Sequence, residues 1–393
     1  MIPVQQAISI VKEHTKPLDT SETKPLSDCL GSTLAKNVIS SINMPPFRQS
    51  AMDGYAVNMH DSNIYAIIDE VKAGDGHQPT LLPGETVRIF TGAPVPDTAN
   101  AIIIQEHVSV EKNILKAHKP VTINANIRPL GEQTKEGNIA LKKGTKLSPA
   151  GIGFLTSLGI TEIDVKKPLS IALVVTGNEL AKAGEPLQYG QIYESNAAML
   201  TSALNDLGYM NVEITSVEDD YQSTYNILKN VISNHDVVLV SGGISVGDYD
   251  FVGKALLEIG VEQLFYKVKQ KPGKPLFFGK KENTIIFALP GNPASALSCF
   301  YVYVQTALQR LSGNEHFELL KTSAKSLSNF TKRGDRAQFL KAIYNNGRVE
   351  ILEGQNSSML HTFALGNALV FVPEDLNLIT INDTVEVVLL PIN

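Results

Sequence analysis

The stretch that decides the fold is VVLVSGGISVGDYDF at residues 237–251. Its first four residues are valine and leucine, which is typical of a strand buried on both faces. Ser-Gly-Gly follows directly, then Ser-Val-Gly and two aspartates. A buried strand that runs into glycines and carboxylates predicts a ligand-binding loop at the end of a parallel sheet.

The same pattern continues on either side of this stretch. SIALVV (170–175), NVEITSV (211–217) and TIIFAL (284–289) predict further strands, and segments with helical spacing separate them. One such helix begins near Asn196, which we expect to be its N-cap, and ends before Gly208. Alternating strands and helices indicate a doubly wound α/β domain with a parallel sheet covered on both faces.

The flanking sequence predicts three more domains in a multidomain α/β and β chain. We expect a mixed α/β linker domain from residues 1–45 plus 141–168, and a small β-rich lid domain at 46–140. The α/β domain then covers 169–316, and a C-terminal β barrel covers 317–393. In the last domain, Asn346-Gly347 predicts a tight hairpin.

Composition excludes several classes of protein. A chain of 393 residues is too long for one core, and its net charge of −6 argues against a general nucleic-acid binder. Two cysteines, Cys29 and Cys299, form no disulfide framework or cysteine-based metal site. No signal peptide opens the chain, and no apolar run approaches the roughly 18–20 residues that span a bilayer. We therefore expect a cytoplasmic protein with no membrane or nucleic-acid partner.

Small, polar and acidic residues follow all four predicted strands. They are Thr176-Gly177-Asn178-Glu179, then Glu218-Asp219-Asp220, then residues 241–250, then Pro290-Gly291-Asn292-Pro293. Carboxyl ends of parallel strands meet at one edge of a sheet, so we expect these loops to lie together. A single loop of this kind is better explained as a strand-to-helix turn with a capping aspartate. Four on one edge favour a site.

The residue types in these loops point to phosphate and magnesium. Glycines let backbone N–H groups approach a phosphate, and Asn292 and Pro293 are expected to cap and start a helix whose free N–H groups attract an anion. Phosphate beside carboxylates is repulsive unless a divalent cation stands between them. We therefore expect Glu179, Asp219 and Asp250 to hold Mg²⁺.

Two further regions carry weaker signals. YKVKQKPGKPLFFGKK (266–281) contains six lysines and no carboxylate. Lys267, Lys269 and Lys271 would share one face of an anion-binding strand, although a lysine-protected strand and turn is the simpler alternative. PPFRQSAMDGYAV (45–57) and IFTGAPVP (89–96) contain Asp53 and Thr91, which by themselves are ordinary turn residues.

Taken together, these segments with QIYESN and VVTGNEL closely resemble the molybdopterin molybdotransferases of the MoeA type, which include the E domain of gephyrin. The resemblance covers essentially the whole chain. It implies insertion of molybdate into adenylyl-molybdopterin, with magnesium-dependent release of AMP. It also implies a homodimer with the active site at the subunit interface, and a contact with a molybdopterin adenylyltransferase.

The resemblance also implies roles for particular residues. Catalytic roles would fall on Asp53, Thr91, Glu179, Asp219, Asp250, Lys267 and Lys271. Substrate binding would fall on Thr176, Gly177, Ser241, Gly242, Gly243, Ser245, Gly247, Lys274, Pro290, Gly291, Asn292 and Pro293. Two positions depart from the family pattern, because Gln133 and Asn178 each replace a usual aspartate.

Two alternatives remain open. The α/β domain also resembles the molybdopterin adenylyltransferases, which perform the preceding step but lack the flanking β domains and a counterpart of Asp53. A binding protein without catalysis, similar to gephyrin in its scaffolding role, is the second. The full set of acidic and phosphate-binding residues favours an enzyme.

Overall fold

The computed structural model describes residues 1–244, 251–314 and 318–391. The chain forms two compact units. Residues 1–22 and 165–393 form the first unit, and residues 23–164 form the second. Each unit is described by itself below.

A six-stranded sheet in the order β16-β13-β17-β21-β20-β18 forms the centre of the first unit. β13 (Ile171–Thr176) pairs in parallel with β16 (Val212–Val217) and β17 (Val237–Ser241), and β17 pairs in parallel with β21 (Thr284–Leu289). β20 (Phe277–Lys281) is antiparallel to both β21 and β18 (Glu262–Phe265). The predicted parallel arrangement is confirmed for the four strands that carry the loops.

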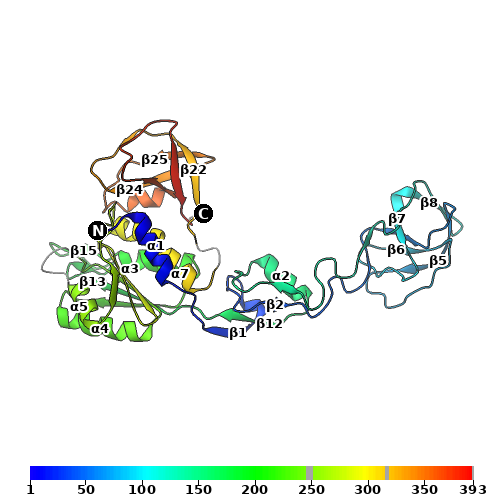
Figure 1. Ribbon diagram of the computed structural model, residues 1–393, viewed down its shortest axis with the longest axis horizontal. Helices are drawn as coiled ribbons and strands as arrows, with labels where there is room; N and C mark the ends of the chain where they lie inside the picture. The colour runs from blue at the N-terminus through cyan, green and yellow to red at the C-terminus, as the bar shows by residue number, and fades with distance from the viewer. Residues whose placement is uncertain (245–250, 315–317, 392–393) are drawn as a thin grey trace. The chain divides into compact units, whose positions relative to one another are not determined.

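Helices cover both faces of this sheet (Figure 1). Alternate residues of β17 point to opposite cores: Leu239 packs with the helices α3 (Asn196–Asp206), α6 (Pro293–Cys299) and α7 (Gln305–Leu311), while Val238 and Val240 pack with α4 (Tyr221–Asn234) and α5 (Phe251–Ile259). A π-helical segment (Phe300–Val304) joins α6 to α7. Burial on both faces explains the uninterrupted apolar strands.

The first helix belongs to this core. α1 (Val4–His14) buries Val4, Ala7 and Val11 in the cluster that contains α3 and α7. The expected division grouped residues 1–45 in one linker domain, but residues 1–22 lie with the first unit because this apolar face packs there.

A second six-stranded sheet forms the C-terminal part of the first unit. Its strands are β19 (Gln270–Lys271), β22 (Lys321–Ser326), β24 (Ala337–Asn345), β25 (Arg348–Ile351), β26 (Ala368–Val372) and β28 (Thr384–Leu389). β26 pairs with both β28 and β24, so the sheet closes into a barrel. Asn346 and Gly347 have φ of +45° and +79° between β24 and β25, as a tight hairpin requires.

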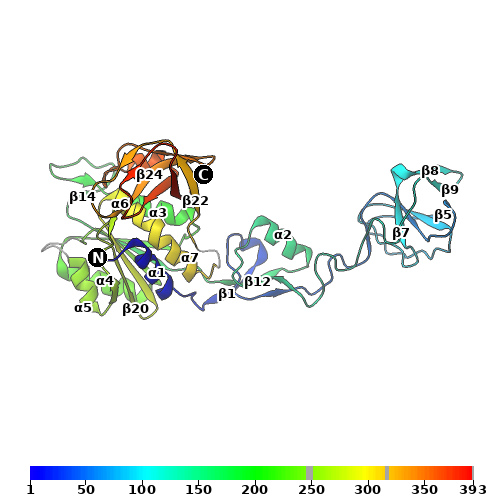
Figure 2. The same cartoon turned by 45° about the horizontal axis from the view of Figure 1, so that its top comes forward.

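The barrel packs against the α/β layer (Figure 2). Phe339, Leu369 and Val388 belong to the same buried cluster as Phe300 and Tyr303. Short elements complete this unit: β14 (Leu180–Ala181), β15 (Ile192–Tyr193), β23 (Phe330–Thr331), β27 (Leu378–Ile379) and α8 (His361–Leu365).

The second unit contains the predicted small β domain. Its main sheet has the order β7-β4-β6-β5-β9-β8, formed by β4 (Gly54–Val57), β5 (Ile64–Val71), β6 (Glu85–Ile89), β7 (Ala101–Ile104), β8 (Val108–Glu111) and β9 (Ile114–Ala117). The remaining helix and strands are α2 (Pro149–Ser157), β2 (Val38–Ile39), β3 (Gln49–Ser50), β10 (Ile127–Arg128) and β11 (Ile139–Leu141). β1 (Ser21–Pro25) pairs with β12 (Glu162–Lys166) where the chain passes between the units.

Within the described part of the chain, no helix combines the length and the apolar character that crossing a membrane requires.

Leu239→Ala tests whether the face of β17 that packs against α3, α6 and α7 is as tightly packed as the structure indicates. Leu239 is fully buried, so the truncation should lower the free energy of unfolding by about 2–5 kcal/mol. Ile214→Ala on β16 is the control, because Ile214 is 49% exposed and should change it by no more than about 0.5 kcal/mol. Urea unfolding followed by circular dichroism measures both. Equal effects of the two variants would contradict the layer assignment.

Candidate functional site

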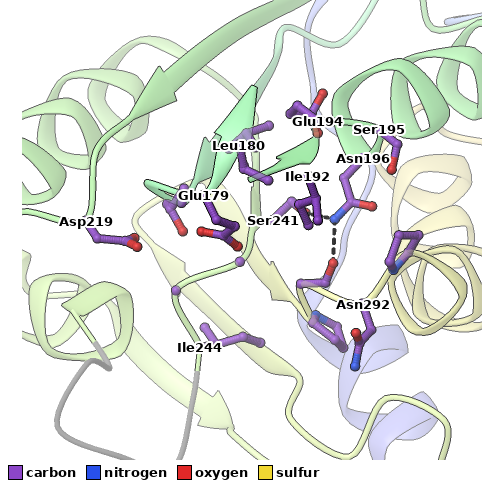
Figure 3. Close-up of a pocket in the computed structure, with 18 of the residues that line it drawn as sticks. Glu179, Leu180, Ile192, Glu194, Ser195, Asn196, Asp219, Ser241, Ile244 and Asn292 are labelled. Carbon is purple, nitrogen blue, oxygen red and sulfur yellow. Dashed lines mark hydrogen bonds between the residues drawn. The ribbon is translucent and has the colours of Figure 1, made fainter. Parts of the chain in front are cut away.

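A cavity of about 670 Å³ lies in the first unit at the carboxyl ends of its parallel strands (Figure 3). Its walls come from the loops after β13, β16, β17 and β21, from the start of α3 and from the C-terminal part of the chain. The predicted residues among its lining are Thr176, Gly177, Glu179, Asp219, Ser241, Gly242, Gly243, Pro290, Gly291, Asn292 and Pro293. The structure therefore brings all four loops together, as expected for loops at the carboxyl ends of parallel strands.

The two aspartates after β16 divide between structure and site. Asp220 caps α4, because its carboxylate accepts a hydrogen bond of 2.7 Å from the backbone N–H of Ser223. That bond holds the pKa of Asp220 below its usual value. Asp219 instead lines the cavity, so only one of the pair takes the capping role that sequence alone left open.

Asn178 holds the loop that carries Asp219. Its amide oxygen accepts a hydrogen bond of 2.9 Å from the backbone N–H of Asp219, and its own N–H donates to the Asp219 carboxylate at 3.3 Å. An aspartate at position 178 would place a second carboxylate beside Asp219. The departure from the family pattern therefore removes a charge while it keeps an acceptor.

Glu179 lies on the same side of the cavity as Asp219 in Figure 3. Its backbone oxygen accepts a hydrogen bond of 2.9 Å from the N–H of Ile192, which ties the β13 loop to β15. A Cβ at Gly177 would lie 2.8 Å from the Glu179 carboxylate oxygen Oε2. Glycine at position 177 thus leaves room for this carboxylate beside the loop.

Gly242 and Gly243 form a close turn after β17. Their φ angles are +91° and +64°, in the left-handed region that glycine adopts most easily. A Cβ on either residue would lie 2.9 or 2.8 Å from the Thr176 hydroxyl oxygen. The hydroxyl group of Thr176 is itself buried and has no hydrogen-bond partner in the part of the chain that the structure describes. The two glycines are required because β13 and this turn approach each other so closely.

Asn196 is a cavity residue that the sequence analysis assigned to a different role. The expected N-cap of α3 is wrong by one position: Ser195 is the N-cap, Asn196 is the first helical residue, and the carboxylate of Glu194 accepts a hydrogen bond from the N–H of Ala197 at 2.9 Å. The Asn196 side chain instead lines the cavity and donates to Ser241 and Gly291. Only its position three residues beyond the end of the short strand β15, in QIYESN, could have signalled this role.

The side chain of Asn292 also differs from the expectation. Asn292 is the N-cap of α6 and Pro293 is the first helical residue, but the Asn292 side chain makes no capping hydrogen bond. Its amide group donates to the Ser357 hydroxyl at 3.2 Å, while the neighbouring Ser358 lines the cavity. A loop of the C-terminal domain therefore completes one wall, which sequence order could not indicate.

A buried lysine holds that loop in place. The Lys341 ammonium group donates to the backbone oxygens of Gly354, Asn356 and Met359 at 2.8, 3.2 and 3.0 Å. Burial lowers the pKa of Lys341, and within the described part of the chain its ammonium group binds backbone oxygens only. The Lys341 ammonium group therefore has a structural role, because it holds the backbone of residues 354–359.

The described lining of the cavity carries carboxylates and no basic side chain. Glu179, Glu194 and Asp219 contribute acidic groups, whereas no lysine, arginine or histidine of the described ranges belongs to the lining. An anion would be repelled here unless a cation neutralises the wall. Among the described residues, no group of three or more histidine, cysteine, aspartate or glutamate side chains is placed to hold a metal by itself.

The predicted lysines lie outside this lining. Lys267 is placed over the ring of Tyr266 with its ammonium 5.4 Å from the ring centre, and Lys271 and Lys274 are exposed. Lys269 does not face an anion site, because it forms ion pairs of 3.3 and 2.8 Å with Asp335 and Glu374. The segment joins the C-terminal sheet through β19 instead of forming the long strand whose alternate lysines would share a face.

Asp53 and Thr91 meet in the second unit. One carboxylate oxygen of Asp53 accepts hydrogen bonds of 2.7 Å from both the backbone N–H and the hydroxyl of Thr91. These bonds, with a smaller contribution from the nearby Arg88 guanidinium, hold the pKa of Asp53 below its usual value. The Asp53 carboxylate therefore remains ionised. Gln133, the other departure from the family pattern, is an exposed residue of the same unit.

Three predicted site residues, Ser245, Gly247 and Asp250, lie outside the described residues.

Comparisons with known proteins cover the whole chain. A family model described as "MoeA N-terminal region (domain I and II)" matches residues 2–159, a "probable molybdopterin binding domain" matches 172–310, and "MoeA C-terminal region (domain IV)" matches 323–390. A molybdopterin molybdenumtransferase from Haemophilus influenzae is 33% identical over 98% of both chains. The chain belongs to the MoeA family.

Two further relatives agree with this assignment. A protein named molybdopterin molybdenumtransferase 2 from Mycobacterium tuberculosis is 33% identical over 94% of both chains. The crystal structure of a molybdopterin biosynthesis MoeA protein from Pyrococcus horikoshii has a TM-score of 0.86, with 27% identity over 99% of this chain and 100% of the other.

Gly243→Ala in this MoeA-family chain should disturb the cavity more than Gly291→Ala. A Cβ at position 243 would lie 2.5 Å from Val252 Cγ2 at a positive φ, whereas one at 291 would meet nothing closer than 3.7 Å. We expect Gly243→Ala to lower the free energy of unfolding by about 2 kcal/mol and Gly291→Ala by less than about 1 kcal/mol. Urea unfolding measures the difference, and two equal values would show that the turn is not strained as described.

Thr91→Val should raise the pKa of Asp53 only part of the way to its ordinary value. The substitution removes the hydroxyl donor but keeps the backbone N–H, which is the larger cause of the lowered pKa. The pKa of Asp53 is lower in the folded than in the unfolded chain. The contact therefore stabilises the fold at a pH above the unfolded pKa of about 3.9, and this stabilisation is lost as the pH falls through the folded pKa. NMR titration of the Asp53 carboxyl measures the shift, and an unchanged pKa would contradict it.

Proposed function

We propose that this chain is a molybdopterin molybdenumtransferase, which inserts molybdate into adenylyl-molybdopterin and releases AMP. The observation that carries the proposal is the acid-lined cavity at the ends of four parallel strands, in a chain related over its full length to proteins of that name. The proposal includes a cytoplasmic location.

The loops after β17 and β21 would bind the phosphates of the substrate. Gly242, Gly243 and Gly291 expose backbone without side chains beside the cavity, and Pro293 starts α6 there. Unpaired backbone N–H groups at such turns attract phosphate oxygens. The reaction would then depend on placement and charge neutralisation, and it requires no covalent protein nucleophile.

Magnesium fits the carboxylate wall. Glu179 and Asp219 line the same side of the cavity, and Mg²⁺ commonly takes one or two carboxylates together with substrate oxygens. The absence of basic groups from the described lining gives a physical reason for a cation, because phosphate would otherwise be repelled. When bound, Mg²⁺ would neutralise charge at the phosphate oxygens. Asp250 remains part of the proposed metal set.

Cationic and N-terminal residues complete the proposal. Lys267, Lys271 and Lys274 would attract molybdate and the pterin phosphate, since Lys271 and Lys274 are exposed and form no ion pair among the described residues. The ionised Asp53, held by Thr91, would act in a homodimer whose active site lies at the subunit interface. A molybdopterin adenylyltransferase would deliver the substrate.

The direct test is AMP release by the purified chain. With adenylyl-molybdopterin and Mg²⁺ present, we expect AMP to form in proportion to the molybdate consumed. Mg²⁺ removal by a chelator should abolish the reaction. Synthesis of adenylyl-molybdopterin from ATP and molybdopterin would instead favour the adenylyltransferase alternative, and binding without either reaction would favour a scaffold.

Charge-removing variants test the carboxylate wall. Glu179→Gln and Asp219→Asn should each lower the rate of AMP release by about a hundredfold, the usual size for one electrostatic contact in an active site. Glu218→Gln is the matched control, because Glu218 is an exposed carboxylate next to Asp219 and does not line the cavity. Full activity of both site variants would refute the proposed magnesium site.

A further inference from the structure

One buried side chain connects two of the cavity loops. Asn196 is 8% exposed, and its amide nitrogen donates to the Ser241 hydroxyl and to the backbone oxygen of Gly291, each at 2.8 Å. Ser241 ends β17, and Gly291 follows β21. Figure 3 shows Asn196 reaching between the two loops from the start of α3.

The hydrogen bonds of the sheet connect these loops only up to Ser241 and Leu289, and the Asn196 side chain binds both loops at this point. β17 and β21 are paired as far as Ser241 opposite Leu289, and one longer bond of 3.3 Å runs from the Gly242 N–H to Leu289. Beyond that point Gly291 stays close to Gly242, since a Cβ on Gly291 would lie 3.7 Å from the Gly242 Cα, but no backbone hydrogen bond among the described residues joins the two loops. The amide nitrogen of Asn196 donates to both loops and so supplies the hydrogen bonds that connect them.

The helix α3, which carries Asn196, is firmly packed in the core. Leu200, Ala203 and Leu204 of α3 are buried in the main core, and the carboxylate of Glu194 binds the Ala197 N–H at the first turn. The first residue of α3 therefore has little freedom to move. A side chain fixed on such a helix can hold the two glycine-containing loops in place.

The side-chain amide of Asn196 carries an energetic penalty. The oxygen of the Asn196 amide is buried and has no hydrogen-bond partner among the described residues, and a buried polar atom left unsatisfied destabilises a fold. A small apolar residue would pack at the start of α3 without that cost. The observation favours a role for the donor nitrogen over a role in core packing alone.

We propose that Asn196 is a positioning residue that sets the spacing of the Ser241–Gly243 and Gly291–Asn292 loops, and through them the affinity for the phosphate-bearing end of the substrate. The substrate part of this inference rests on the proposed function. Asn196 acts through the loops, and the reacting atoms need not touch it.

The test compares Asn196→Asp with Asn205→Asp. The first keeps the size of the side chain and removes both N–H donors, while the second places the same change on the exposed face of the same helix. Asn196→Ala separates loss of the donor from the added charge. Ser241→Ala removes one acceptor and leaves Asn196 in place, so it remains informative if an Asn196 variant fails to fold.

The first readout needs no substrate. Amide hydrogen exchange in peptides covering residues 237–244 and 288–292 should rise about fivefold in both Asn196 variants, since each peptide loses one hydrogen bond of about 1 kcal/mol, which corresponds to that factor. Ser241→Ala should raise the exchange rate in the first peptide, whereas Asn205→Asp should raise it in neither peptide. Unchanged hydrogen exchange in the Asn196 variants would overturn the proposal that Asn196 holds the two loops.

The second readout separates positioning from a merely structural role. In the AMP-release assay, the KM for adenylyl-molybdopterin should rise about tenfold in Asn196→Asp while kcat stays within about threefold. A fall in kcat at constant KM, or faster exchange with normal kinetics, would overturn the positioning role. If the wild-type chain releases no AMP, the proposed function fails, and hydrogen exchange still decides whether Asn196 tethers the loops.

Discussion

The structure depends on the burial of both faces of the central parallel strands β13 and β17. β13 and β17 have every residue buried, because α3, α6 and α7 cover one face and α4 and α5 cover the other. A polar group inside these strands would have no water to bind. Chemistry is therefore confined to the strand ends, where the backbone leaves the sheet and becomes accessible.

This constraint also explains what the sequence could predict. Apolar runs identified the parallel strands, and the rule that their carboxyl ends share an edge placed Thr176, Glu179, Asp219, Ser241 and Asn292 around one cavity. The sequence predicted the glycine pair 242–243 as backbone open to a phosphate, and the structure adds a steric reason, because a Cβ on either residue would clash with Thr176. Local sequence was sufficient wherever one strand and its following loop determined the position.

Sequence reasoning was weaker where a side chain depends on a partner far along the chain. An asparagine at a helix start is normally a cap, and only the fold shows that Asn196 reaches residues 45 and 95 positions away. The ion pairs of Lys269 were equally hard to predict, because its partners Asp335 and Glu374 belong to the C-terminal domain. Period-2 spacing of lysines could not distinguish an anion-binding strand from a segment that joins a different sheet.

The charge distribution of the cavity gives the proposed reaction a physical rationale. Glu179 and Asp219 face a space without basic side chains among its described lining, so we expect phosphate alone to bind there weakly. On the proposed function, these carboxylates would hold a divalent cation, whose charge would favour binding of the substrate's diphosphate group. Once that bond is cleaved, each product carries its charge on a separate phosphate and shares fewer contacts with the wall. An acidic cavity bridged by a cation would therefore hold the intact substrate more tightly than AMP, which favours product release.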